Sequence, residues 1–251
     1  GSTYFKPKKS GALEVTSVGD LILYLLMNIP LYAALAVLTW KLGPDNLGML
    51  GSSVSYLIYA VLLGLYLFQT ARILQINLSL FSEEVPELER YSFRQVAALN
   101  LSYMVTFGSE LAIVSMLILF YQDTFALSPV MAGLIASIFA GLNIIMRPAG
   151  GWISDNFGRK RSLGMIMLGL VLGFLMMSQI DSSWSLPSAI LVTIFCSLFV
   201  NAGNGAVFAM IPLVKRRLTG QIAGMTGAYG NVGAVTFLTV LSFVETELFF
   251  L

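Results

Sequence analysis

The chain has 251 residues, of which 57% are hydrophobic and 11% are charged. Soluble domains carry about 25% charged residues, so this chain lacks the polar surface needed to cover itself in water. The absence of histidine excludes a histidine-based catalytic triad or zinc site, and the single cysteine excludes an intramolecular disulfide and an iron–sulfur cluster. The net charge of +1 does not indicate a nucleic-acid partner, and none is expected.

Several apolar segments are long enough to cross the roughly 30 Å hydrocarbon core of a bilayer. They are about twice as long as a transmembrane β-strand and do not alternate, so they predict an all-α, polytopic membrane protein embedded in the lipid bilayer. The seven expected spans are residues 19–40, 51–76, 95–121, 129–151, 163–180, 187–213 and 220–244.

The basic residues predict the orientation of these spans. Twelve of the 14 fall on one side of the seven-crossing path, which the positive-inside rule assigns to the cytoplasmic side of a cytoplasmic membrane. They form the groups Lys6, Lys8, Lys9; Arg72, Arg90, Arg94; Arg159, Lys160, Arg161; and Lys215, Arg216, Arg217.

The longest connection, residues 77–94, lies on the same expected side. Its composition fits a linker between two helical bundles and a solvated loop equally well. It carries four glutamates, Glu83, Glu84, Glu87 and Glu89.

The stretch "GGWISDNFGRKR" (150–161) contains a pattern G-x-x-x-D-x-x-G-R-K/R. Glycines permit a tight turn between helices, and the aspartate can cap a helix or pair with a cation. A generic charged turn would explain the charges but not their spacing. The spacing resembles the cytoplasmic loop motif of the major facilitator superfamily, here carried by Gly151, Asp155, Gly158, Arg159, Lys160 and Arg161.

Three further stretches resemble the nitrate/nitrite porter family of that superfamily. They are "YMVTFGSELA" (103–112), "GLNIIMRPAGGWISD" (141–155) and the glycine-rich "NAGNGAVFAMIPLVKRRLTGQIAGMTGAYGNVGAV" (201–235). The resemblance implies that residues 1–76 are the last two helices of an N-terminal bundle and that 77–94 is the cytoplasmic loop between bundles. Residues 95–251 would then be a C-terminal bundle that ends before its last helix. The chain is thus expected to be a fragment that needs the missing N-terminal helices for function.

The resemblance also implies an activity. A nitrate/nitrite porter is a secondary transporter that moves nitrate, and nitrite, across the cytoplasmic membrane by alternating access, in nitrate assimilation. A proton is the expected coupling ion and no other cofactor or metal is expected. No G-x-x-x-x-G-K-[ST] run is present, so an ATP-driven pump is disfavoured.

Three alternatives remain at this point. The superfamily loop fits a transporter of another small solute, and a non-transporting nitrate receptor could share the fold. A membrane-embedded enzyme would need convergent titratable groups, yet only Glu110 and Arg147 are charged side chains away from the ends of the expected spans; Asp20 and Arg72 lie near span ends. The chain is therefore not expected to be an enzyme.

Arg147 is the main candidate for substrate binding. An unpaired arginine at mid-bilayer costs at least about 2.5–3.5 kcal/mol, so one interpretation is an anchor that reaches the membrane edge. Other cations already serve that edge, however, and Asn143 lies one helical turn earlier on the same face. A guanidinium offers a planar fork of donors that suits a planar oxyanion. The resemblance places the family's substrate arginine at this position.

The span 95–121 carries a polar stripe on one helical face. Tyr103 aligns with a family tyrosine that hydrogen-bonds the anion. Glu110, near the middle of the span, must be protonated, paired with a cation or exposed to a cavity. We hypothesise that Glu110 takes up the coupling proton; the alternative is a structural ion pair or a hydrogen bond between helices. The stripe comprises Asn100, Tyr103, Thr106 and Glu110.

Glycines recur every three or four residues in the last span. They predict close helix packing, which could serve packing alone, sliding of helices or contact with a small anion. Asn231, the polar side chain central to this face, is expected to touch the substrate; Asn204 is a weaker candidate and Tyr229 is expected only to pack. The close-packing glycines are Gly224, Gly227, Gly230 and Gly233.

Overall fold

The computed structural model describes residues 12–82, 85–244 and 250, and these contain helices but no strand. Contacts divide the chain into two compact units, which are described one at a time. Unit 1 comprises Gly1–Ala98 and Val214–Gly224; unit 2 comprises Leu99–Leu213 and Met225–Leu251. Five charged residues named above lie outside the described ranges: Lys6, Lys8, Lys9, Glu83 and Glu84.

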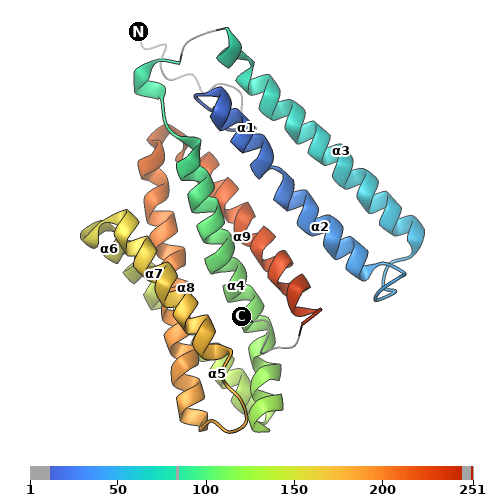
Figure 1. Cartoon of the computed structure of the whole chain (residues 1–251), viewed down its shortest axis with the longest axis vertical. Helices are drawn as coiled ribbons and strands as arrows, with labels where there is room; N and C mark the ends of the chain where they lie inside the picture. Colours follow the sequence, from blue (N-terminus) through green and yellow to red (C-terminus); the bar gives the residue numbers. More distant parts are fainter. Residues whose placement is uncertain (1–11, 83–84, 245–249, 251) are drawn as a thin grey trace. The chain divides into compact units, whose positions relative to one another are not determined.

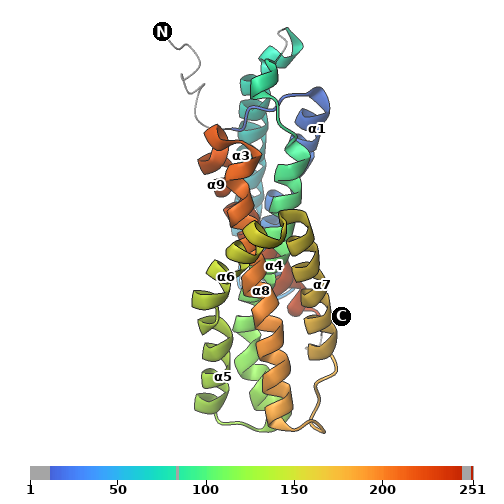
Figure 2. The same ribbon diagram turned by 90° about the vertical axis from the view of Figure 1, so that its left-hand side faces the viewer.

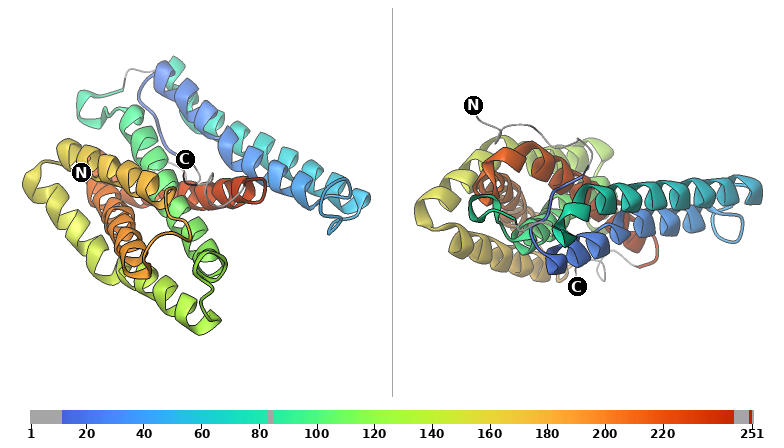
Figure 3. Two further views of the ribbon diagram at one scale, coloured as in Figure 1. Left: turned by 60° about the horizontal axis from the view of Figure 1, so that its bottom comes forward. Right: turned by 90° about the horizontal axis from the view of Figure 1, so that it is seen from above.

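Unit 1 is built on a helical hairpin. Helix α2 (Ile29–Leu42) lies beside α3 (Ser52–Asn77), as Figures 1 and 3 show. The expected span 19–40 is two helices, because α1 (Val18–Met27) stops at Asn28 and α2 begins with a proline in its first turn. Proline lacks an N–H and is favoured in the first turn of a helix, where that N–H would have no partner within the helix.

The connection after α3 packs against the segment that precedes α1. Asn77, at the end of α3, accepts a hydrogen bond from the Val15 N–H at 2.8 Å and donates to the Leu13 carbonyl at 3.1 Å. Tyr91 donates its hydroxyl proton to the Glu14 carbonyl at 2.8 Å. Buried backbone groups of the segment are thereby satisfied. Two short 3₁₀ helices lie in this connection, η2 (Leu78–Phe81) and η3 (Glu87–Glu89).

Unit 2 is organised around α8 (Leu186–Val214). Figure 2 shows α8 between α5 (Pro129–Gly141) and α7 (Arg159–Met177). Ser197 of α8 donates to the Phe139 carbonyl of α5 at 2.7 Å, and Cys196 packs on Gly173 of α7. The expected span 129–151 is also two helices, since α6 (Asn143–Phe157) begins after a break at Leu142.

Two helix crossings in unit 2 bring backbones into direct contact. A Cβ added at Gly205 of α8 would lie 1.8 Å from the Arg147 carbonyl oxygen of α6, and one at Gly150 would lie 2.0 Å from the Ala202 carbonyl oxygen. Similarly, a Cβ on Gly233 of α9 (Thr219–Leu241) would lie 2.1 Å from the Met104 carbonyl oxygen of α4 (Phe93–Phe125). Only glycine permits such approaches, which is how membrane helices commonly pack.

The four glycines predicted to pack closely on the last span differ in their surroundings. Gly233 sits at the crossing with α4, and a Cβ at Gly230 would lie 2.7 Å from the ring of Tyr103. Gly224 and Gly227 have no atom within 4 Å of an added Cβ. Close packing is therefore found in the second half of this glycine series and not in the first.

Six helices of the described chain are long and apolar enough to cross a membrane, one fewer than expected. The difference lies in α9, which is a continuous helix of 23 residues at the expected place. Its glycines and threonines, together with Gln221 and Asn231, lower its hydropathy below that of the six spanning segments. The six are Val18–Leu42, Ser52–Phe81, Glu87–Phe125, Pro129–Phe157, Arg159–Met177 and Leu186–Val214.

Candidate functional site

The site in unit 2 centres on the carboxylate of Glu110, which is buried in α4. The Nδ2 of Asn143 in α6 donates to its Oε1 at 2.7 Å. The Nδ2 of Asn204 in α8 donates to its Oε2 at 2.6 Å, and the Nη2 of Arg147 in α6 reaches the same oxygen at 3.3 Å. Three donors from two neighbouring helices therefore converge on one carboxylate. Such bonds offset the cost of removing a charge from water.

Arg147 and Glu110 form an ion pair whose two members differ in exposure. The Arg147 side chain is 35% exposed, while that of Glu110 is only 7% exposed. The Arg147 Nε is buried without a hydrogen-bond partner in the described part of the chain. Because a guanidinium carries five N–H donors, Arg147 keeps donors for a further ligand while it pairs with Glu110.

Aromatic rings border the guanidinium of Arg147. Its Cζ lies 5.5 Å from the centre of the Phe107 ring, which stacks on Tyr103 at 5.1 Å. Arg147 lies close enough to the Tyr103 hydroxyl to interact with it electrostatically. Phe208 of α8 also contacts Tyr103, edge to face, with 4.8 Å between ring centres. The cation therefore has an apolar wall and one hydroxyl beside it, a setting that strengthens electrostatic contacts.

The local sequence explains why these side chains meet. Asn143 and Arg147 are four residues apart on α6, so both project from one face, and both reach Glu110. The glycine contacts between α6 and α8 bring Asn204 beside that face. The tetrad of α4, α6 and α8 comprises Glu110, Asn143, Arg147 and Asn204.

The remaining polar residues of the predicted site lie apart from this tetrad. Asn231 is exposed, and its Nδ2 donates to the Gly227 carbonyl of its own helix at 3.5 Å. Asn100 accepts a hydrogen bond from Thr226 at 2.7 Å and so links α4 to α9. The Thr106 hydroxyl is buried without a partner in the described residues. Contact between Asn231 and the substrate thus stays a prediction.

The loop motif forms the connection between α6 and α7. Gly158 alone separates the two helices, with a φ of +90° that L side chains rarely adopt. Asp155 and Arg159 approach to 3.8 Å, one turn apart, and both are exposed. Lys160 and Arg161 are exposed, and Gly151 faces α8 at ordinary contact distances. The motif therefore makes a tight turn rather than a binding cavity.

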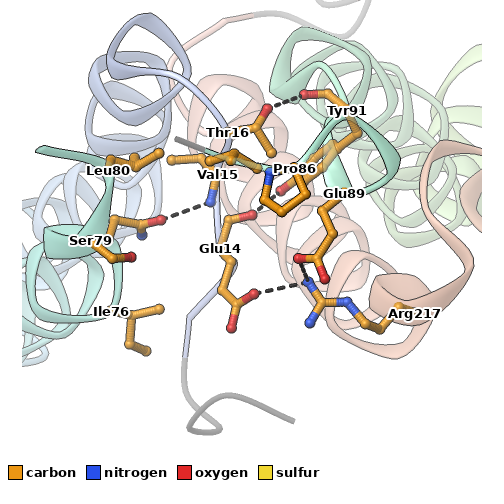
Figure 4. Close-up of a pocket in the computed structure, with 12 residues that line it drawn as sticks. Glu14, Val15, Thr16, Ile76, Ser79, Leu80, Pro86, Glu89, Tyr91 and Arg217 are labelled. Atoms are coloured by element: carbon orange, nitrogen blue, oxygen red, sulfur yellow. Dashed lines mark hydrogen bonds and ion pairs between the residues drawn. The ribbon is translucent and has the colours of Figure 1, made fainter. Parts of the chain in front are cut away.

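A second polar cluster, in unit 1, lines a pocket that the sequence did not reveal. The carboxylates of Glu14 and Glu89 converge on the Arg217 guanidinium, at 2.9 Å and 3.4 Å (Figure 4). The three residues come from the segment before α1, from η3 and from η4 (Arg216–Leu218). The one sequence feature that pointed to such a cluster was the presence of charged residues in three separate connections. Over the described ranges, no group of His, Cys, Asp or Glu side chains could hold a metal ion.

Comparison with known proteins identifies the family. The family model of the Major Facilitator Superfamily matches residues 17–238. The chain therefore belongs to the major facilitator superfamily, and the expected all-α, multi-pass membrane fold is confirmed. No solved structure gives a significant match.

Curated relatives support the resemblance to the nitrate/nitrite porters. The nitrate/nitrite transporter NrtP of Picosynechococcus sp. is 48% identical over 245 residues, covering 96% of this chain and 45% of the relative. The protein of the same name from Nostoc punctiforme is 43% identical over 253 residues, covering 100% of this chain and 51% of the relative.

A plant protein shows the same relationship over a shorter range. The high-affinity nitrate transporter 2.3 of Oryza sativa subsp. japonica is 39% identical over 142 residues, 55% of this chain and 28% of the relative. The chain spans about half the length of the first two relatives it matches.

Proposed function

We propose that the protein is a secondary transporter that moves nitrate, and nitrite, across the cytoplasmic membrane by alternating access, coupled to protons. Membership of the major facilitator superfamily supports a transporter, and relatives named nitrate/nitrite transporters support the anion. The observation that carries the proposal is the ion pair of Arg147, a partly exposed cation with unused donors in an apolar bundle.

Arg147 is suited to bind a small planar oxyanion. Nitrate and nitrite spread one negative charge over oxygens in a plane, and two parallel N–H···O bonds fit them as they fit a carboxylate. Glu110 makes a single contact with Arg147, between Oε2 and Nη2 at 3.3 Å, and so leaves other guanidinium donors for an anion. The Tyr103 hydroxyl, close to Arg147, offers a further donor.

Glu110 provides a route for proton coupling. While Glu110 is ionised, it neutralises Arg147 and competes with an incoming anion. A proton on Glu110 removes that competing charge and leaves Arg147 free for nitrate. Anion and proton would therefore bind together, because each makes the binding of the other more favourable.

The membrane potential favours this coupling when more than one proton accompanies each anion. The complex then crosses with net positive charge, and an inside-negative potential contributes about 2.3 kcal/mol per elementary charge per 100 mV. Binding near the midplane between two helical bundles is the usual arrangement in transporters built from repeats.

The test compares nitrate uptake by the full-length protein in proteoliposomes with that of Arg147→Lys. Lysine keeps the positive charge but loses the planar fork, so uptake should fall at least about tenfold if two parallel hydrogen bonds carry recognition. Arg94→Lys is the matched control, because Arg94 is exposed near the start of α4, far along the helix from Glu110.

The outcomes separate the proposal from its rivals. Equal uptake by wild type and Arg147→Lys would reduce Arg147 to an anchor of the helix end. Nitrate binding without uptake would indicate a receptor. Uptake of another solute but neither nitrate nor nitrite would leave only the superfamily assignment.

A further inference from the structure

We propose that Asn204 is a positioning residue that supports both the ionised and the protonated form of Glu110 by turning its side-chain amide. This inference rests on the proposed proton role of Glu110 and adds a residue to that mechanism. It concerns how a buried carboxyl group can gain and lose a proton while the carboxyl group itself keeps a hydrogen-bond partner.

In the structure, Asn204 serves the ionised form. Its Nδ2 donates to Glu110 Oε2 at 2.6 Å, the shortest of the three contacts to that carboxylate. Asn204 is 1% exposed, so water cannot easily take its place. Its Oδ1 is buried and has no hydrogen-bond partner in the part of the chain that the structure describes.

A protonated Glu110 would need a different partner. Its carboxyl group would then carry an O–H donor, whereas the groups that contact it now are all donors. An unpaired buried donor costs about 1–3 kcal/mol. The protonated form therefore requires a nearby acceptor.

Asn204 can supply that acceptor without moving its backbone. Rotation of the amide by half a turn exchanges Nδ2 and Oδ1, which have nearly the same shape. Oδ1 has no partner in the present state, so the rotation breaks no hydrogen bond of that oxygen. The only bond lost is the one from Asn204 Nδ2 to Glu110, which protonation of Glu110 weakens. The unpaired oxygen is thus the acceptor that the second state needs.

Asn204 is the best placed of the three groups that contact Glu110 for this part. The guanidinium of Arg147, from α6, has no acceptor. The amide of Asn143 has one, but Asn143 is only partly buried, whereas Asn204 is 1% exposed and its oxygen is unpaired in the described residues. The titratable or charged groups that face Glu110 are Arg147 and, from α4 itself, Tyr103. The packed helices α8 and α9 carry no charged side chain.

The test is infrared difference spectroscopy of the full-length protein in proteoliposomes during a pH titration. The Glu110 signal is assigned by its loss in Glu110→Gln. The carbonyl band of a protonated carboxyl group moves to higher frequency when the group loses its hydrogen bonds. In Asn204→Leu, the protonated Glu110 band should therefore shift upward, whereas Asn204→Ser should restore it because a hydroxyl both donates and accepts.

Asn201→Leu is the matched control. Asn201 lies one turn earlier on α8 and is equally buried, with an unpaired Oδ1 of its own, but it bonds to Ser197 and not to Glu110. Its variant should leave the Glu110 band at the wild-type position. Folding of each variant is checked by thermal unfolding in detergent.

The outcomes distinguish the two proposals. An unchanged protonated band in Asn204→Leu would overturn the role of Asn204 while leaving the proton role of Glu110 intact. The same holds if Asn201→Leu shifts the band equally. The absence of any protonated Glu110 band in wild type at acidic pH would overturn the proton role itself.

Discussion

Arg147 of α6 and Glu110 of α4 form an ion pair in which 3.3 Å separates the guanidinium Nη2 from the carboxylate Oε2. Glu110 is held by two further amide donors and is nearly closed off, whereas about a third of the Arg147 side chain is exposed. The pair therefore joins a fixed, buried anion to an accessible cation. We infer that Arg147 can change partners while Glu110 stays in place.

The crossing of α6 and α8 should tolerate no side chain at Gly205. Gly205→Ala would place a methyl group 1.8 Å from the Arg147 carbonyl oxygen, so the helices must separate and Arg147 must move. We expect a loss of stability of about 1–3 kcal/mol or more, and reduced nitrate uptake. Thermal unfolding of the full-length protein in detergent measures the first effect.

Gly164→Ala provides the control for that experiment. Gly164 lies exposed on α7, and nothing is within 4 Å of an added Cβ. Alanine is favoured over glycine within a helix by up to about 1 kcal/mol, so this variant should be neutral or more stable. Equal melting temperatures for the two variants would show that the crossing is not closely packed.

The loop motif should depend on Gly158 for its backbone conformation. At a φ of +90° a side chain is strained, and Gly158→Ala should destabilise the protein by about 1–3 kcal/mol. Gly151→Ala, in the same motif, adds a Cβ at ordinary contact distances of 3.6 Å or more and should cost less. Thermal unfolding of the two variants in parallel checks this. A larger loss of stability in Gly151→Ala than in Gly158→Ala would contradict the assignment of the strain to Gly158.

The polar cluster of unit 1 should contribute modestly and in a salt-dependent way. Arg217→Gln leaves Glu14 and Glu89 facing each other without the shared cation. Since all three side chains are partly exposed, we expect a loss of only about 0.5–1 kcal/mol at low ionic strength. High salt should reduce the difference.

Arg216→Gln is the control for the cluster, because Arg216 is exposed in the same short helix. A melting temperature that is unchanged in Arg217→Gln at low salt would mean that the ion pairs contribute nothing to stability. A loss that persists at high salt would point to packing of the arginine stem instead.

Hydropathy alone located the helices to within a few residues, because a bilayer imposes length and apolarity on each span. The expected 187–213 corresponds to α8 at Leu186–Val214, for example. The breaks at Asn28 and Leu142 were missed, since neither interrupts the apolar run. The weaker hydropathy of α9 follows from its threonines, Gln221 and Asn231 and from its glycines, some of which also let it approach α4.

The residues of the site could be predicted from the sequence, but the contacts between them could not. A charge within an apolar run is conspicuous, so Glu110 and Arg147 could be chosen one at a time, and helical spacing placed Asn143 with Arg147. Their partnership depends on how α4, α6 and α8 rotate against one another. That rotation is set by backbone contacts at glycines such as Gly150 and Gly205, which sequence spacing cannot describe.

Glu14, in contrast, could not be singled out from the sequence. It lies in a short polar segment before the first helix, where nothing in the local sequence distinguishes it from a solvated residue. Its ion pair with Arg217 joins positions 203 residues apart. Such a contact follows only from the folded chain.

The most direct measurement of the central claim is nitrate binding by the purified full-length protein, wild type against Glu110→Gln, at acidic and at alkaline pH. Glutamine mimics the protonated carboxyl group and cannot neutralise Arg147. If Glu110 competes with the anion, wild type should bind nitrate more tightly as the pH falls, and Glu110→Gln should bind tightly at both pH values. Glu89→Gln, which alters a carboxylate of unit 1, should behave as wild type. Loss of nitrate binding in Glu110→Gln, or retention of the wild-type pH dependence, would contradict the account.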